Sequence, residues 1–140
     1  MMYQKALLFN DYEAAKEVLK ASNPRKAKAI GRNVRNFDEV RWNAVREGVV
    51  RQGNILKFTN AVTEQGFRIG TGADLPPIVG SLKEMLLATG ERELVEASPF
   101  DKIWGIGYTA ADADHTKRSC WGLNLLGKVL MEVRETLRDG

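Results

Sequence analysis

The spacing of apolar residues predicts a chain built mostly from helices. The clearest segment lies near the C-terminal end, where apolar side chains recur at intervals of three and four residues and so share one helix face. This pattern predicts a helix over residues 121–138, with the apolar stripe as its main buried surface. The stripe consists of Leu125, Leu126, Val129, Leu130, Val133 and Leu137.

Capping residues predict where other helices begin. Asn10 and Glu13 have the spacing of a capping box, and the residues that follow favour helix. Asn23 and Pro24 supply a cap and a first helical residue for the next helix. Two more starts are predicted in the same way, at Asp38 and at the capping box formed by Ser81 and Glu84.

The helix that begins after Asp38 should bury one apolar face. Trp42, Val45, Val49 and Leu56 follow one another at helical intervals, which places them on the same side of the helix. We therefore expect these four side chains to pack together against the rest of the domain.

Glycine and proline interrupt the helical pattern in the middle of the chain. Residues 61–80 contain four glycines and two prolines and keep no regular period, which predicts a long surface loop or insertion. Residues 93–98 alternate weakly between apolar and polar positions and predict a short strand, and residues 103–107 predict a second. The expected fold is a mainly α, compact helical domain with a few short strands.

Length and composition limit the class of protein. A chain of 140 residues, 44% hydrophobic and 28% charged, is typical of one globular domain and not of a disordered chain. Its apolar runs are too short for a membrane span, and we expect a cytoplasmic protein without membrane contact. The one cysteine, Cys120, and the one histidine, His115, favour neither disulfides nor metal clusters. We expect Cys120, beside Trp121, to be a buried structural thiol.

Positive charge is concentrated in one segment. Residues 16–35 contain seven basic residues and one acidic residue, Glu17, although the whole chain carries a net charge of only +3. A basic segment of this kind favours a phosphate-bearing partner, either a nucleic acid or a phosphorylated small molecule. The alternative interpretation is a helix face that is simply solvated.

The segment from Glu96 to Trp104 combines acidic and aromatic residues. Glu96 lies between two apolar residues, so its carboxylate needs a polar partner or a polar cavity. Asp101 follows Pro99 in a predicted turn and precedes Trp104. A carboxylate can stabilise a cationic, sugar-like transition state, and an aromatic ring can hold a flat base. The alternative is an ordinary turn aspartate before a core tryptophan.

Several blocks of the sequence form an ordered set that spans nearly the whole chain. In chain order they are residues 2–6 (MYQKA), 23–32 (NPRKAKAIGR), 34–38 (VRNFD) with Trp42, 57–58 (KF), 87–90 (LATG), 94–99 (LVEASP), Asp101 with 103–107 (IWGIG), and 121–127 (WGLNLLG) with Arg134. In content and order these blocks resemble the YbiA-like family, also called the NADAR superfamily. The resemblance implies a compact, mainly helical fold and hydrolysis of N-glycosidic bonds. Known activities of the family include cleavage of phosphorylated riboflavin-pathway intermediates and removal of ADP-ribose from modified bases.

The resemblance also implies roles for individual residues. Asp101 and Glu96 are the expected catalytic residues, with Asp101 stabilising an oxocarbenium-like state and orienting water. Trp42 and Trp104 would border the base, and Lys5 would meet a phosphate or ribose oxygen. The remaining substrate-binding candidates are Asn124, Arg32 and Arg35. The expected partner is a phosphorylated nucleoside-like small molecule, and neither a metal nor an organic cofactor is expected.

The chain departs from the family pattern at its start. The family's first helix carries an acidic residue a few positions before the point that matches Met1, so we expect residues 1–140 to be a single domain that is N-terminally incomplete. That departure favours one alternative to an active N-glycosidase, a catalytically inactive module that binds ADP-ribose or a related nucleotide. The basic segment at residues 16–35 favours a second alternative, a basic helical module that binds nucleic acid.

Overall fold

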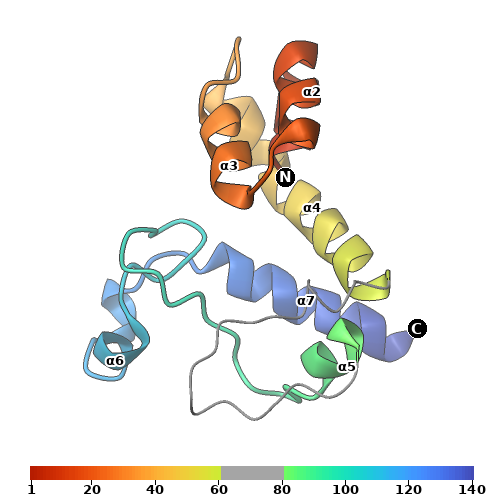
Figure 1. Ribbon diagram of the computed structural model, residues 1–140. Coiled ribbons are helices and arrows are strands. Elements are labelled where there is room, and N and C mark those ends of the chain that lie inside the picture. Colours follow the sequence, from red (N-terminus) through yellow and green to blue (C-terminus); the bar gives the residue numbers. More distant parts are fainter. Residues whose placement is uncertain (61–80) are drawn as a thin grey trace. The chain divides into compact units, whose positions relative to one another are not determined.

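The computed structural model describes residues 1–60 and 81–140 (Figure 1). The chain divides into two compact units, Met1–Val50 and Arg51–Gly140. The loop or insertion predicted for residues 61–80 lies outside the described residues. None of the helices in the two described ranges combines the length and apolar character that crossing a bilayer requires.

The first unit is a small helical cluster. Its elements are α1 (Met2–Leu8), α2 (Tyr12–Lys20), α3 (Pro24–Arg32) and the first part of α4 (Glu39–Thr59). Helices α1, α2 and α3 pack against one another, and α2 and α3 lie side by side in Figure 1. Burial of apolar surface in their shared core stabilises the unit. The buried core consists of Ala6, Phe9, Ala14, Ala15, Val34 and Trp42.

Two of the three predicted helix caps in this unit are confirmed. The Asn23 side chain accepts a hydrogen bond from Lys26 N–H at 2.9 Å, and the Asp38 carboxylate accepts one from Arg41 N–H at 2.8 Å. The capping box predicted for Asn10 and Glu13 is wrong. Asn10 has a left-handed φ of 56°, so the next residue, Asp11, is the N-cap of α2.

The apolar face predicted for α4 is correct only in part. Trp42 is buried, and Val49 packs against the core of the first unit. Val45 is 37% exposed and Leu56 is 53% exposed. The reason is that helical spacing identifies residues on one face but does not establish that other elements cover the whole length of that face.

The second unit is also helical among the described residues. It contains the end of α4, α5 (Leu82–Leu87), α6 (Ala110–Ala113), the short 3-10 helix η2 (Arg118–Cys120) and α7 (Leu125–Asp139). The predicted capping box of Ser81 and Glu84 is present at the start of α5. Helix α7 packs against α5. The stripe prediction is confirmed at Leu125, Val129, Val133 and Leu137, which are buried, whereas Leu126 and Leu130 are half-buried.

The mainly helical fold is confirmed, but the two short strands are wrong. In the described ranges, residues 93–98 and 103–107 form irregular backbone and no strand is present. Among the described residues, one backbone hydrogen bond joins the two segments, from Ile106 N–H to the Glu96 carbonyl at 3.0 Å, and other polar groups of the segments bond to the start of α7. Leu125 N–H donates to the Ile103 carbonyl at 3.1 Å, and Leu126 N–H donates to the Trp104 carbonyl at 3.0 Å. The loop carbonyls thus satisfy N–H groups that a helix start otherwise leaves unpaired.

Candidate active site

In the first unit, the structure brings Lys5 and Trp42 together. The Lys5 ammonium donates a hydrogen bond to the Gly31 carbonyl at 2.7 Å, in the last turn of α3. Its Nζ lies 4.3 Å from the centre of the Phe37 ring and 5.8 Å from the centre of a Trp42 ring. Burial lowers the pKa of Lys5 below its ordinary value of 10.5. The arrangement holds a cation between aromatic faces and a helix C-terminus, both of which favour positive charge.

Gly31 permits this arrangement because it has no side chain. A Cβ at this position would collide with the Met2 side chain of α1, so glycine lets the two helices approach closely without displacing Met2. The close approach is what places the Gly31 carbonyl within reach of Lys5.

The two arginine candidates lie in different surroundings. Arg32 is exposed at the end of α3. Arg35 forms an ion pair with Asp11, with 2.9 Å between Nη2 and Oδ1, while two thirds (67%) of its side chain stays exposed. The side-chain and backbone hydrogen bonds from Arg35 lower the pKa of Asp11 to about 2. Much of the Arg35 charge is therefore already matched by a carboxylate in the folded unit.

In the second unit, the structure brings Asp101 and Trp104 together in a tight turn. The Asp101 Oδ1 accepts hydrogen bonds from Ile103 N–H at 2.9 Å and from Trp104 N–H at 2.8 Å. Within residues 1–60 and 81–140, the other carboxylate oxygen, Oδ2, accepts no hydrogen bond. Asp101 and Trp104 are both half-buried. The hydrogen bonds to Oδ1 thus fix the orientation of the carboxylate, and Oδ2 has no hydrogen-bond donor among the described residues.

Asn124 and Glu96 are also adjacent. Asn124 is 6% exposed, and its side-chain oxygen accepts a hydrogen bond from Glu96 N–H at 3.0 Å. Its amide nitrogen donates to the Leu94 carbonyl at 2.9 Å. The Asn124 side chain therefore bonds to residues 94–96 much as a neighbouring strand would. Glu96 itself is an exposed residue.

Gly127 permits the approach of residues 94–96 to α7. A Cβ at Gly127 would collide with the Leu94 carbonyl and with the Asn124 side chain. Glycine at this position is therefore a packing requirement and not a matter of backbone flexibility.

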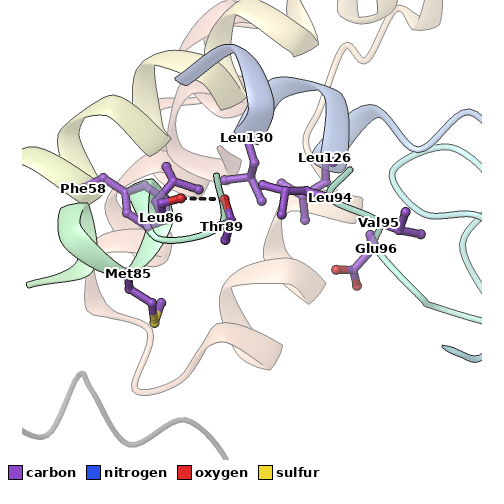
Figure 2. Close-up of a pocket in the computed structure, with 10 residues that line it drawn as sticks. Phe58, Met85, Leu86, Thr89, Leu94, Val95, Glu96, Leu126 and Leu130 are labelled. Carbon is purple, nitrogen blue, oxygen red and sulfur yellow. Dashed lines mark hydrogen bonds between the residues drawn. The ribbon is translucent and has the colours of Figure 1, made fainter. Parts of the chain in front are cut away.

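A pocket of about 250 Å³ adjoins this segment (Figure 2). Figure 2 shows Glu96 on the side of the pocket away from Phe58 and Met85. Asp101 and Trp104 are not among the lining residues, which are Phe58, Met85, Leu86, Thr89, Leu94, Val95, Glu96, Leu126, Gly127 and Leu130. The lining is mostly apolar, with the Glu96 carboxylate as its one acidic group.

The sequence reasoning missed two residues of these clusters. Phe37 lies nearer to the Lys5 ammonium than Trp42 does, although the sequence singled out only Trp42. Asp11 holds Arg35, and the signal available in the sequence was its position directly before a helix-forming run.

The prediction that the Cys120 thiol is buried is wrong, because Cys120 is exposed at the end of η2.

Comparison with known proteins gives consistent matches over nearly the whole chain. The NADAR domain family model matches residues 1–138. An N-glycosidase of Acanthamoeba polyphaga mimivirus is 42% identical over 136 residues, which cover 96% of this chain and 69% of that protein. Protein irg-1 of Caenorhabditis elegans is 35% identical over 139 residues, which cover 97% of this chain and 57% of that protein. N-glycosidase YbiA of Escherichia coli is 30% identical over 135 residues, which cover 96% of this chain and 67% of that protein.

These relatives are longer than the chain, which spans 57% to 69% of their lengths. Two of the three are named N-glycosidases. At this level of identity, the names indicate that the chain is related to the N-glycosidases, enzymes that hydrolyse N-glycosyl compounds.

Proposed function

The chain belongs to the NADAR domain family, and from this premise we propose that it hydrolyses the N-glycosidic bond of a phosphorylated ribosyl-base. In this reaction the bond between C1 of the ribose and the base nitrogen breaks, and its electron pair leaves with the nitrogen. Water adds to C1, and its proton is transferred to the departing base. The products are a free base and ribose phosphate.

The observation that carries this proposal is the geometry of Asp101. Two backbone N–H groups fix its Oδ1, while Oδ2 accepts no hydrogen bond from the described residues. A carboxylate held in this way stabilises positive charge that develops at C1 and need not reorganise as the charge appears. It can also accept a hydrogen bond from the attacking water. Glu96 is the second carboxylate proposed to contribute.

The proposed binding groups differ in chemistry. The Lys5 ammonium, desolvated and bonded to one carbonyl, still has two N–H groups to donate to a phosphate oxygen. Trp104 is half-buried and offers part of its aromatic face to a flat base. Trp42 is buried in the core of the first unit and would act mainly by supporting the Lys5 ammonium, which lies 5.8 Å from the centre of its ring. Arg32, which is exposed, would add positive charge for the phosphate, and Arg35 would add less because its guanidinium is paired with Asp11. Asn124 is assigned a supporting role, since its side chain already bonds to Leu94 and Glu96.

A second candidate function is binding of ADP-ribose or a related nucleotide without hydrolysis. The cluster of Lys5, Phe37 and Trp42 favours it, because a cation beside aromatic rings suits a phosphorylated, base-bearing ligand whether or not a bond is broken. The riboflavin-pathway and ADP-ribosyl substrates of the family are therefore both candidate ligands.

The two candidates are separated by measuring products and binding on the same protein. The chain is incubated with ribosyl-base monophosphates and with ADP-ribosyl compounds, and released base and ribose phosphate are quantified by chromatography. Catalytic release of both products supports the N-glycosidase. Saturable binding of the same compounds, with no product beyond the rate without protein, would support the binding module and contradict the proposed hydrolysis.

A further inference from the structure

A buried carboxylate ties the start of α2 to the segment that leads into α4. Asp11 is 3% exposed, and its Oδ2 accepts a hydrogen bond from Arg35 N–H at 2.9 Å. Its Oδ1 accepts hydrogen bonds from Arg35 Nη2 at 2.9 Å and from Ala14 N–H at 3.2 Å. A buried charge requires such partners, because its desolvation is costly. Arg35 is therefore fixed both at its backbone and at its side chain.

The residues after Arg35 transmit this constraint to Phe37. Asn36 has a left-handed φ of 56°, a conformation with a narrow allowed range for residues other than glycine. On the far side of Phe37, Asp38 is fixed by the hydrogen bond that it accepts as the cap of α4. With both flanking residues fixed, the position of Phe37 depends on the bonds between Asp11 and Arg35.

Phe37 forms one side of the environment of Lys5. The Lys5 ammonium lies 4.3 Å from the centre of the Phe37 ring, within the range of a cation–π interaction. Phe37 also meets the buried Phe9 edge to face, with 5.4 Å between ring centres. The Phe37 ring and the Gly31 carbonyl together determine which way the remaining Lys5 N–H groups point.

From these contacts we propose that Asp11 is a positioning residue, which acts through Arg35 to hold Phe37 against Lys5 and so orients the ammonium group. The consequence for substrate rests on the proposed function, in which Lys5 binds a phosphate. The geometry itself does not depend on that function and is measured without substrate.

The test uses a variant that separates helix capping from the ion pair. In Asp11→Ser the shorter side chain still caps α2, because serine is a favoured N-cap residue, but it cannot reach Arg35. The readout is the NMR signal of the Lys5 ε-methylene group, which the Phe37 ring current shifts. Phe37→Leu marks the signal position without that ring. The matched control, Glu93→Gln, breaks a two-bond carboxylate–arginine pair with Arg118 in the second unit.

The proposal predicts that Asp11→Ser moves the Lys5 signal toward its position in Phe37→Leu, while Glu93→Gln leaves it unchanged. For a phosphorylated substrate, KM should rise roughly tenfold or more, the scale expected when a hydrogen bond to a charged group is lost, with kcat changed much less. A residue that only stabilises the fold would not raise KM while leaving kcat nearly unchanged.

An unchanged Lys5 signal in folded Asp11→Ser would overturn the proposal. If that variant does not fold, Arg35→Gln replaces it, because it keeps both the cap and the backbone bond to Asp11 and removes only the guanidinium. A displaced Lys5 signal in a protein without hydrolytic activity would leave the positioning role intact and count against the proposed function.

Discussion

Gly127→Ala offers a sharp test of how α7 is packed against residues 94–96. The added methyl group would collide with the Leu94 carbonyl and would lie 2.6 Å from the Asn124 Oδ1. Neither neighbour is the free end of a flexible side chain, since Asn124 is buried and bonded at both of its amide atoms. To accommodate the methyl group, residues 94–96 must therefore move away from the helix.

The size of the effect follows from three contributions. Forcing an extra methyl group into a packed site costs about 1–3 kcal/mol. Losing the two Asn124 hydrogen bonds costs about 1–3 kcal/mol more. Alanine is a better helix former than glycine by about 1 kcal/mol, which offsets part of this loss. We expect Gly127→Ala to lower the free energy of unfolding by about 3 kcal/mol.

Gly53→Ala is the matched control, because it makes the same change in α4 of the same unit. Outside its own helix, a Cβ at Gly53 would meet no atom of residues 1–60 and 81–140 within 4 Å, so this variant should be more stable than the parent by about 0.4–1 kcal/mol. Urea unfolding followed by circular dichroism gives both free energies. Hydrogen exchange of the Glu96 amide, the donor to Asn124, should accelerate only in Gly127→Ala. Equal stability of the two variants would refute the packing assigned to Gly127.

Two further predictions concern stability. Val133→Ala should lower the free energy of unfolding by about 2–3 kcal/mol, because the Val133 side chain is fully buried and its loss leaves a cavity. Leu130→Ala should lower it by less, because Leu130 is half-buried, and urea unfolding gives the free energy of both variants. The pKa of Asp11 falls from an ordinary value of 3.8 to about 2 on folding, so its contribution is present above about pH 4 and is lost as the pH falls toward 2. Unfolding measured across that range should show a shallower loss of stability in Asp11→Asn than in the parent, and equal slopes would contradict the assignment.

Local sequence signals predicted the parts of the fold that depend on local physics. The caps at Asn23, Asp38 and Ser81 are correct because each requires only a side chain that reaches the first turn of its own helix. The stripe on α7 is correct where one face meets a core, as at Val129 and Val133.

Contacts between distant residues could not be predicted in this way. The strands expected at 93–98 and 103–107 are absent because distant groups take up their backbone hydrogen bonds. The Asn124 side chain, 28 residues after Glu96, bonds to residues 94–96, and the start of α7 bonds to the carbonyls of Ile103 and Trp104. Phe37 was missed for the same reason, since only the folded first unit brings its ring to Lys5. The two glycines can be told apart only when their neighbours are known: Gly127 is required by the Leu94 carbonyl, whereas no neighbouring group of the described part of the chain requires Gly53.

The central claim, that the Asp101 carboxylate stabilises the charge of the breaking N-glycosidic bond, is tested most directly by the kcat of Asp101→Asn. The asparagine side-chain oxygen can still accept the hydrogen bonds from Ile103 and Trp104, so the turn is kept while the negative charge is removed. With a ribosyl-base monophosphate that the parent hydrolyses, we expect kcat to fall about 10²–10³-fold with KM little changed. Equal kcat values for the parent and a correctly folded Asp101→Asn would contradict it and would leave Asp101 as a turn residue.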